Sequence, residues 1–253
     1  MKIATWNVNG IRARKTQFID WIAAERPDIV CLQEIKASPA QVAEAIGELT
    51  DLPAYASYWH GNDKGYSGVS LHVRRDTFAG SSPVFSHPPF DHETRVVEVR
   101  LGELRVASIY VPNGGKDYPA KLAFLRALGA YVSESPNKGS KLVLCGDMNV
   151  ARDDRDVHPS ERKPGAIGQR DDERELFEAI LTGGSLLDVA RAMNPENDRM
   201  FTWWPYWREA RKRNIGWRID YVLASPTLRC LETRISVDVG TSDHAPLVAL
   251  FEG

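Results

Sequence analysis

The sequence has few cysteines, and they are not arranged as ligands or as disulfide partners. Its 253 residues contain three of them, Cys31, Cys145 and Cys230, which are far apart and odd in number. Neither a disulfide framework nor a cysteine-based zinc motif is therefore indicated. Two of the three lie inside apolar runs, which is typical of small buried residues in a reducing cytoplasm.

The sequence also lacks a strong net charge and long apolar runs. A net charge of −2 excludes a general attraction to nucleic acid, so any polyanion binding requires a local basic patch. The apolar runs are too short to cross a bilayer. Met1-Lys2 leads directly into strand-like sequence instead of a leader peptide. From these absences we expect a soluble, cytoplasmic protein with no membrane partner.

What the sequence does contain is an alternation of strand and helix patterns, which predicts an α/β fold. No repeat or hinge interrupts it, so we expect one domain over residues 1–253. Residues 151–171 are polar and irregular, and we expect a long ordered loop there. The expected strands are 2–8, 28–33, 55–60, 68–74, 94–101, 104–110, 142–145, 218–224, 235–239 and 247–250; the expected helices are 12–26, one opened by Ser38-Pro39, 118–131 and 172–181.

A turn near the C-terminus brings three chemically capable side chains together. Ser242, Asp243 and His244 lie in the turn at residues 240–246, between two strand-like runs. A turn of this kind displays its side chains at a sheet edge, where functional residues often lie. Serine and aspartate are also ordinary turn residues. A functional interpretation therefore depends on partners from the rest of the chain.

Polar side chains follow most of the other apolar strands. In an open α/β sheet such strand ends converge on one crevice. Several carboxylates and amides with one imidazole and no cysteine suit Mg²⁺ or Mn²⁺ better than Zn²⁺. Such a set favours metal-assisted phosphoryl transfer to water, with Asp220 fixing the tautomer of His244. The residues are Asn7, Asn9, Glu34, Tyr110, Asn113, Asp147, Asn149, Asp220, Asp243 and His244.

Seven short motifs occur in order along nearly the whole chain. They are Trp6-Asn7-Val8-Asn9-Gly10, Leu32-Gln33-Glu34, Gly65-Tyr66-Ser67-Gly68-Val69, Tyr110-Val111-Pro112-Asn113-Gly114, Gly146-Asp147-Met148-Asn149-Val150, Gly216-Trp217-Arg218-Ile219-Asp220-Tyr221 and Ser242-Asp243-His244-Ala245-Pro246. Together they resemble the motifs of the exonuclease III family, within the endonuclease/exonuclease/phosphatase superfamily. The resemblance implies a DNase I-like, four-layer α/β/β/α sandwich of two packed mixed sheets flanked by helices.

The resemblance also implies roles around a Mg²⁺ ion that Mn²⁺ can replace. Asp147 and Asn149 would orient or deprotonate the attacking water. His244, paired with Asp220, would stabilise the phosphate. Asn9 stands where some relatives carry aspartate, which leaves the number of metals open. The implied metal set is Glu34, Asn7, Asp243, Asp147, Asn149 and His244, and the implied catalytic set is Tyr110, Asp147, Asn149, Asp220 and His244.

A second cluster combines tryptophans with cations. Four of the seven tryptophans lie between residues 201 and 218, among Arg208, Arg211, Lys212, Arg213 and Arg218. This mixture suits a nucleic-acid surface; the alternative is a tryptophan core beneath a solvated basic face. The resemblance implies that Trp203, Trp217 and Ile219 form an apolar pocket for an extruded abasic sugar. The other expected DNA contacts are Arg95, Asn113, Lys116, Trp207 and Arg213.

These implications give one main hypothesis and two alternatives. The main hypothesis is a monomeric, Mg²⁺-dependent phosphodiesterase of base excision repair. It would incise duplex DNA 5′ to abasic sites and process blocked 3′ ends as a 3′→5′ exonuclease and 3′-phosphatase. A superfamily relative acting on RNA or phospholipid would lack the tryptophan pocket. A non-catalytic RNA-binding regulator would have lost the metal and phosphate ligands.

The other histidines, His60, His72, His87 and His92, show no ligand spacing, and His158 lies in the polar loop.

Overall fold

The structure is a computed structural model that describes the chain except residues 47–53, 79, 81 and 135–140. The described residues form two six-stranded sheets, with orders β11-β12-β1-β2-β4-β3 and β5-β6-β7-β8-β10-β9. The first sheet comprises β1 (Lys2–Asn7), β2 (Ile29–Gln33), β3 (Tyr55–His60), β4 (Val69–Arg74), β11 (Cys230–Ile235) and β12 (Leu247–Phe251). The second comprises β5 (Val84–Ser86), β6 (Val96–Leu101), β7 (Leu104–Tyr110), β8 (Lys141–Asp147), β9 (Leu187–Asp188) and β10 (Asp220–Ala224).

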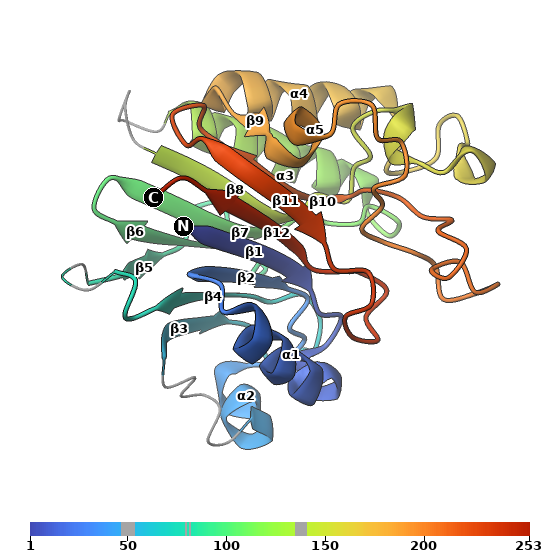
Figure 1. Ribbon diagram of the computed structural model, residues 1–253. Coiled ribbons are helices and arrows are strands. Elements are labelled where there is room, and N and C mark those ends of the chain that lie inside the picture. The colour runs from blue at the N-terminus through green and yellow to red at the C-terminus, as the bar shows by residue number, and fades with distance from the viewer. Residues whose placement is uncertain (47–53, 79, 81, 135–140) are drawn as a thin grey trace.

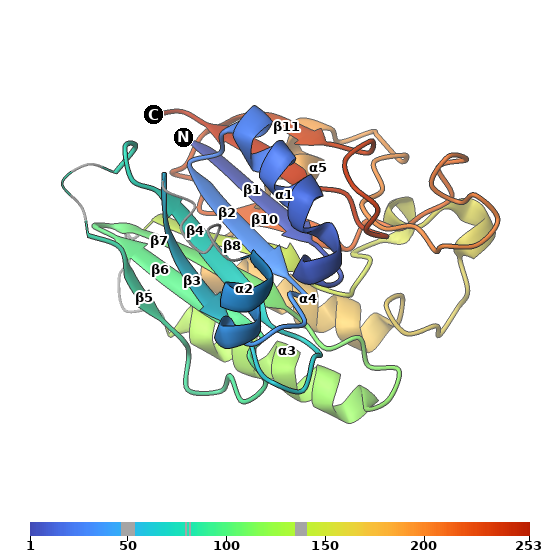
Figure 2. The ribbon, with the colours of Figure 1, turned by 90° about the horizontal axis from the view of Figure 1, so that it is seen from below.

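Helices cover the outer faces of both sheets, so the molecule has four layers (Figure 1). The helices α1 (Ile11–Glu25) and α2 (Pro39–Ile46) lie on the first sheet, and α3 (Tyr118–Ser133) and α4 (Asp171–Gly184) lie on the second. The short helix α5 (Val189–Met193) packs against β10 and β11. The two termini lie side by side (Figure 2), where the Met1 amino group donates to the Phe251 carbonyl at 2.8 Å. The expected α/β/β/α sandwich is confirmed.

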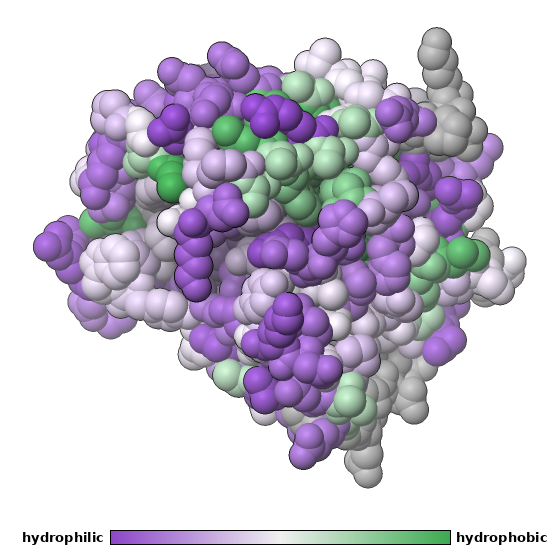
Figure 3. Space-filling model, turned by 180° about the vertical axis from the view of Figure 1, so that it is seen from behind, coloured by the Kyte–Doolittle hydropathy of each residue, from purple (hydrophilic) through white to green (hydrophobic). Residues whose placement is uncertain are grey.

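The surface seen in Figure 3 is mostly hydrophilic, with apolar side chains gathered near its upper part. Among the described residues, no helix has the length and apolar character needed to cross a membrane.

Side chains alternate along the strands, and the inner-face side chains fill the space between the sheets. Most of these are apolar, but those at one end of the strands are polar. In β1, Ile3 packs into the core between the sheets, whereas Ala4 and Trp6 pack toward α1. Because side chains alternate in a strand, Thr5 and Asn7 share the inner face with Ile3. The same alternation in the second sheet places Tyr110, Asp147 and Asp220 on the inner face, and the register pairs both Tyr110 and Asp220 with Asp147.

Local capping explains where two of the helices begin. Ser38 accepts a hydrogen bond from the Gln41 amide at 3.3 Å, and the Gln41 side chain accepts from the Ser38 amide at 3.0 Å. This reciprocal cap starts α2 at Pro39, as the sequence predicts. Asp117 accepts from the Ala120 amide at 2.9 Å and starts α3 in the same manner.

The structure corrects three expectations about the elements. Residues 235–239 are not a strand: β11 ends at Ile235, and the Arg211 guanidinium binds the carbonyls of Val237 and Val239, which turns the chain away from β12. The helix expected at 172–181 runs from Asp171 to Gly184. The loop before it contains two short 3-10 turns, and β5, β9 and most of β11 were not expected from the sequence.

A buried histidine inside the first sheet makes stability depend on pH. The imidazole of His72 in β4 lies between the hydroxyls of Ser70 and Ser57, each at 2.9 Å. Burial lowers the pKa of His72 to about 3. Between pH 6.5 and 3 the unfolded chain therefore binds a proton that the folded chain does not. The free energy of unfolding falls with falling pH in this window, by up to about 1.4 kcal/mol per pH unit.

We predict that His72→Gln removes this contribution. The difference in free energy of unfolding between the unmodified protein and the variant should shrink by about 3 kcal/mol from pH 7 to pH 4. Urea unfolding followed by circular dichroism at several pH values measures it. His92→Gln, at an exposed histidine, is the control and should keep the original pH dependence. Parallel curves for His72→Gln and the unmodified protein would contradict the prediction.

Candidate active site

A cavity of about 280 Å³ lies at the end of the sandwich where the polar strand ends meet. In Figure 1, the yellow loop after β8 and the orange loop before β10 project from this end. Most of the sequence-predicted site residues line the cavity, and Asn7 and Asp220 lie directly behind it, bonded to lining residues. The lining residues are Glu34, Tyr110, Asn113, Asp147, Asn149, Ile167, Gly168, Trp203, Trp217, Ile219, Asp243 and His244.

The imidazole of His244 is buried between two aspartates. Its Nδ1 lies 2.8 Å from Asp220 Oδ2, and its Nε2 lies 3.8 Å from Asp147 Oδ2. Burial alone would lower the pKa of His244, but the Asp220 carboxylate outweighs burial and raises it to about 10. The ring is therefore protonated at neutral pH, with Nδ1–H donated to Asp220 and Nε2–H directed toward the cavity side. It is a hydrogen-bond donor more than a metal ligand in this state.

Asp147 is a carboxylate held in a crowded, buried place. It is fully buried, and burial is the main cause that raises its pKa to about 8. The His244 charge opposes this rise, while Asp220 and Glu34 add to it. Its Oδ1 accepts from the Asn149 backbone amide at 2.9 Å. The geometry thus fixes the orientation of this carboxylate but leaves its negative charge poorly compensated.

Glu34 follows β2 in a strained backbone conformation. Its φ is +49°, in the left-handed region that glutamate rarely adopts. The Asn7 amide donates to both Glu34 Oε1 and Asp147 Oδ2 at 2.9 Å, and Lys36 lies 2.7 Å from Glu34 Oε2. Although burial opposes it, the Lys36 charge lowers the pKa of Glu34. Asn7 thus turns its NH₂ group, not its oxygen, toward the acids; the oxygen accepts from the Asn9 amide. Sequence reasoning missed Lys36.

Two amides and a phenol complete the polar side of the cavity. Asn149, at φ +50°, donates to the Val111 carbonyl at 2.8 Å, and its Oδ1 accepts from Asn113 at 3.3 Å. Burial raises the pKa of Tyr110 well above its usual range, helped by the charges of Glu34 and Asp147. Tyr110 is therefore a neutral donor at the mouth of the site.

Asp243 faces the cavity with both oxygens already occupied. Its Oδ1 accepts from Asn9 at 2.8 Å, and its Oδ2 accepts from Trp203 Nε1 at 3.0 Å. Burial opposes ionisation of Asp243, but the His244 charge lowers its pKa overall. The carboxylate therefore orients the tryptophan wall through its bond to Trp203.

The site fits a divalent cation. Glu34, Asp147 and His244 each offer one ligand atom, and these atoms lie within 4.8 Å of one another. Because His244 is protonated, the two carboxylates are the stronger ligands. Carboxylate oxygens suit hard divalent cations, and the raised pKa of Asp147 reflects negative charge that a cation would compensate.

The other side of the cavity is apolar. Trp203 and Trp217 meet edge to face, with ring centroids 5.7 Å apart and an interplanar angle of 77°. They pack against Ile219, beside the backbone of Gly168. A methyl group at Gly168 would approach the Trp217 ring to 2.8 Å. Ile167 and Gly168 belong to this wall, and sequence reasoning missed both because they lie in the irregular loop.

The residues expected to contact DNA lie in two regions, a groove beside the cavity and an exposed surface outside both. Arg95 packs over the Tyr110 ring at 4.9 Å, and it lines, with Lys116 and Asn113, a groove of about 870 Å³ that includes Tyr110. Trp207 and Arg213 are exposed and line neither this groove nor the cavity.

Two cations of the basic segment are not available to a polyanion. Arg218 is buried, with Nε 2.7 Å from Asp156 and an NH₂ group 2.8 Å from Asp188. Arg211 stacks on Trp204 and donates to backbone carbonyls, including that of Ser242. Trp204 itself is buried. The interpretation of this segment as a nucleic-acid surface therefore does not extend to Arg218, which pairs with buried acids, or to Arg211, which bonds the backbone carbonyls of Val237, Val239 and Ser242.

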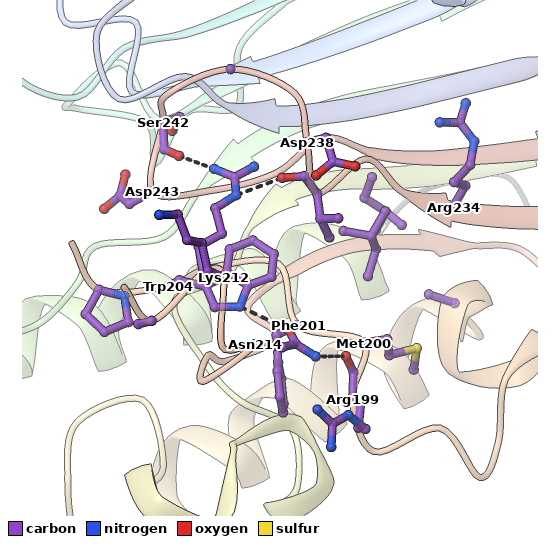
Figure 4. A pocket seen from close by; sticks show the side chains of 18 of the residues that line it. Arg199, Met200, Phe201, Trp204, Lys212, Asn214, Arg234, Asp238, Ser242 and Asp243 are labelled. Atoms are coloured by element: carbon purple, nitrogen blue, oxygen red, sulfur yellow. Dashed lines mark hydrogen bonds between the residues drawn. The ribbon is translucent and has the colours of Figure 1, made fainter. Parts of the chain in front are cut away.

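A larger cavity, of about 910 Å³, lies on the other side of the loop that contains Asp243 (Figure 4). Trp204 donates to Asn214 at 3.1 Å there, and Asn214 donates to the Arg199 carbonyl at 3.0 Å. Asp243 lines both cavities. These bonds lie behind the loop. The larger cavity lacks Glu34, Asp147 and His244, which line the smaller one.

A buried ion pair supports the cavity of about 280 Å³ from the helix layer. Lys121 in α3 contacts Glu173 in α4, and neither side chain is exposed. Lys121 Nζ also donates to the Asn149 carbonyl at 2.7 Å, and Glu173 accepts from the Gly168 amide. Burial lowers the pKa of Lys121, while Glu173 opposes this shift. The pair thus joins both helices to the two loops that form the cavity.

Comparison with known proteins finds relatives along the whole chain. The model of the endonuclease/exonuclease/phosphatase family matches residues 4–244. An exodeoxyribonuclease of Bacillus subtilis is 35% identical, with 98% of each chain covered. An AP endonuclease of Archaeoglobus fulgidus has a TM-score of 0.88 and 32% identity over 100% of both chains. The 3′ phosphatase NExo from Neisseria, solved with a product DNA hairpin, has a TM-score of 0.87 and 31% identity over 100% of both chains.

We predict that breaking the Lys121–Glu173 pair is costly. Glu173→Gln leaves a buried ammonium without its anionic partner, and the free energy of unfolding should fall by about 3 kcal/mol or more. Adding Lys121→Met should recover part of the loss. Glu178→Gln is the matched control: it lies on the same helix, is 45% exposed and pairs with Arg152, and should cost less than about 1 kcal/mol. Equal losses in urea unfolding would contradict the prediction.

Proposed function

The chain belongs to the endonuclease/exonuclease/phosphatase family, and on this premise we propose that it is a metal-dependent phosphodiesterase of damaged duplex DNA. The observation that supports this most directly is the cavity itself. It combines the buried Asp147, the partly buried Glu34 and an aspartate-paired imidazole on one side with a tryptophan wall on the other. The first set suits hydrolysis of a phosphodiester, and the second suits a sugar without a base.

Asp147 is the proposed general base. It would hold the attacking water through Oδ2 and accept its proton as the water oxygen bonds to phosphorus. The bond from phosphorus to the 3′-oxygen would break at the same time, and that oxygen would take a proton from solvent to leave a 3′-hydroxyl and a 5′-phosphate. Burial raises the pKa of Asp147 to about 8 in the metal-free site; a cation shared with Glu34 would lower this pKa, so that the carboxylate is ionised and can accept the proton. The Asn149 backbone amide holds the other oxygen of Asp147 at 2.9 Å, so the carboxylate needs no reorientation when the water arrives.

His244 is the proposed donor to the phosphate. Its Nε2–H would stabilise the negative charge that develops on a phosphate oxygen. The bond from Nδ1 to Asp220 fixes the ring and keeps it protonated, because it raises the pKa to about 10. Tyr110 and Asn113 would hold the remaining phosphate oxygens as neutral donors.

Glu34 and Asp147 are the residues proposed to hold the metal, with Asn7 and Asp243 orienting the groups around them. A bound divalent cation, for which we propose Mg²⁺ with Mn²⁺ as substitute, would act as a Lewis acid that neutralises charge on the phosphate. Lys36, 2.7 Å from Glu34, holds one oxygen of that carboxylate and leaves the other to face the cavity with Asn7.

The apolar wall supports selection of abasic nucleotides. Trp203, Trp217 and Ile219 offer no pattern of donors and acceptors that would match a base, and the cavity of about 280 Å³ is small. Extruding a nucleotide costs unstacking and unpairing energy, which is lowest where the base is missing. We therefore propose incision 5′ to abasic sites, with exonuclease and phosphatase activity where the same cavity receives a 3′ end.

We also propose that the protein works as a monomer in the reducing cytoplasm. All three cysteines are free, and Cys31 and Cys145 are buried in the core between the sheets. Free buried thiols are typical of a reducing compartment. The catalytic cavity is complete within one chain, so catalysis requires no second copy.

We predict that an end-labelled duplex with one tetrahydrofuran abasic analogue is cut 5′ to the analogue with Mg²⁺ and not with EDTA. Asp147→Asn and His244→Asn should each lower the rate by about 10²- to 10⁴-fold, because each removes a proton-transfer or charge-stabilising group. Asp63→Asn, at an exposed acid, is the control. Full activity of either variant would refute these roles, and cleavage confined to RNA would favour the superfamily alternative.

A second prediction concerns the tryptophan wall. Gly168→Ala forces the Trp217 ring to move. The rate of abasic incision should fall by about tenfold or more, because small displacements near the reacting atoms lower the reaction rate. Gly165→Ala is the matched control: it lies in the same loop with φ +74°, close to the +89° of Gly168, but a methyl group there meets nothing within 4 Å. Both variants share the backbone strain, so equal rates would contradict a role for the Trp217 contact.

A further inference from the structure

Two histidines that are 27 residues apart in the sequence lie together at one edge of the sandwich. His60 is the last residue of β3, the edge strand of the first sheet. His87 directly follows β5, the edge strand of the second sheet. Asp91 lies in the loop between β5 and β6. None of the three lines the catalytic cavity. The spacing of these histidines in the sequence does not indicate a ligand set, because two different sheets bring His60 and His87 together.

The three side chains are arranged as metal ligands. His60 Nε2 lies 2.7 Å from Asp91 Oδ2, and the rings of His60 and His87 have centroids 3.9 Å apart. One ligand atom from each residue lies within 4.8 Å of the other two. The ligand atoms of tetrahedral zinc are about 3.3 Å apart. The pair of His60 and Asp91 would open by roughly 0.6 Å to accept an ion, and His87 would move inward.

The surroundings fix the carboxylate and leave an entrance. The Asp91 side chain is fully buried, and its oxygens accept from the backbone amides of Arg95 at 2.8 Å and Val96 at 3.2 Å. Hydrogen bonds of this kind orient a metal ligand from outside its coordination shell. His87 is exposed, and it contacts the Tyr58 hydroxyl at 3.1 Å. An ion can therefore reach the site from solvent.

We propose that His60, His87 and Asp91 bind a divalent transition-metal ion of the zinc class, separate from the catalytic site. Two imidazoles and a carboxylate form a known zinc ligand set, with a fourth position for water. Imidazole nitrogen favours such ions over Mg²⁺, so this site and the oxygen ligands of the catalytic cavity select different metals.

Such an ion would tie the two sheets together where they are joined only by side chains. The edge strands β3 and β5 already touch through the stacked rings of Tyr58 and Phe85, 5.3 Å apart. The Asp91 loop leads on to Arg95, which packs over Tyr110 at the mouth of the active site. The ion would therefore act on the stability of this edge and on the loop that borders the catalytic groove.

Zn²⁺ binding by protein purified without a polyhistidine tag tests the proposal. The background variant Glu34→Gln removes a ligand of the catalytic site, so that the counted ion belongs to the other site. Equilibrium dialysis with metal analysis should find one Zn²⁺ per chain in this background. His87→Gln, added to it, should weaken that binding at least about tenfold. His92→Gln, an exposed histidine five residues away, is the matched control and should leave it unchanged.

Thermal unfolding gives a second measurement. Zn²⁺ at about a hundred times its dissociation constant should raise the unfolding midpoint by roughly 5 °C in the Glu34→Gln background. The rise should persist with His92→Gln and fall to about half or less with His87→Gln or His60→Gln, because a tenfold weaker affinity leaves only about half of the stabilisation at this Zn²⁺ concentration. His87 is exposed, so its replacement should leave the metal-free midpoint unchanged. Equal Zn²⁺ stoichiometry and equal midpoint shifts for His87→Gln and His92→Gln would overturn the proposal.

Discussion

One side-chain amide joins the two halves of the sandwich at the point where the candidate chemistry lies. The Asn7 NH₂ group, from the first sheet, donates to Glu34 at the end of the same sheet and to Asp147 in the opposite sheet, each at 2.9 Å. These bonds exist only because the two inner faces pack in one register, with Asn7, Asp147 and Asp220 all at the polar end. A shift by one residue in β1 would send Asn7 toward α1. The cavity therefore depends on how the two sheets pack, and the apolar core between them fixes that packing.

The charged side chains around the cavity are paired with partners, and these partners are held in turn by groups further from the cavity. Asp220 holds His244, and the Lys121–Glu173 pair holds the loops of Asn149 and Gly168. Burying such charged groups is expensive unless each is paired. These pairs hold the reacting groups rigidly, and this matters because a misplacement of about 1 Å can lower the rate a hundredfold.

The sequence predicts an α/β fold from its alternation of strand and helix patterns, whereas the four-layer sandwich follows from the resemblance to the family. A polar residue after an apolar run marks a strand end, and this local rule identifies most of the residues around the cavity. Local rules do not identify groups that meet only through tertiary packing. Lys36 over Glu34, Gly168 against Trp217, and His60 beside His87 all depend on backbones brought together from different elements. The strand expected at 235–239 failed for the same reason, because Arg211 from a distant segment captures its carbonyls.

Three polar residues around the cavity have left-handed backbone conformations. Asn9, Glu34 and Asn149 all have φ between +45° and +50°, a region that costs residues other than glycine about 1 kcal/mol or more each. Asparagine tolerates it, but glutamate does not do so readily. At Glu34 the unusual turn comes directly after β2 and directs the carboxylate across the seam toward Asp147. A relaxed backbone would point that side chain elsewhere, and the two acids would no longer share a cation. The strain at Glu34 is thus the local cost of placing ligands from two sheets within reach of one ion.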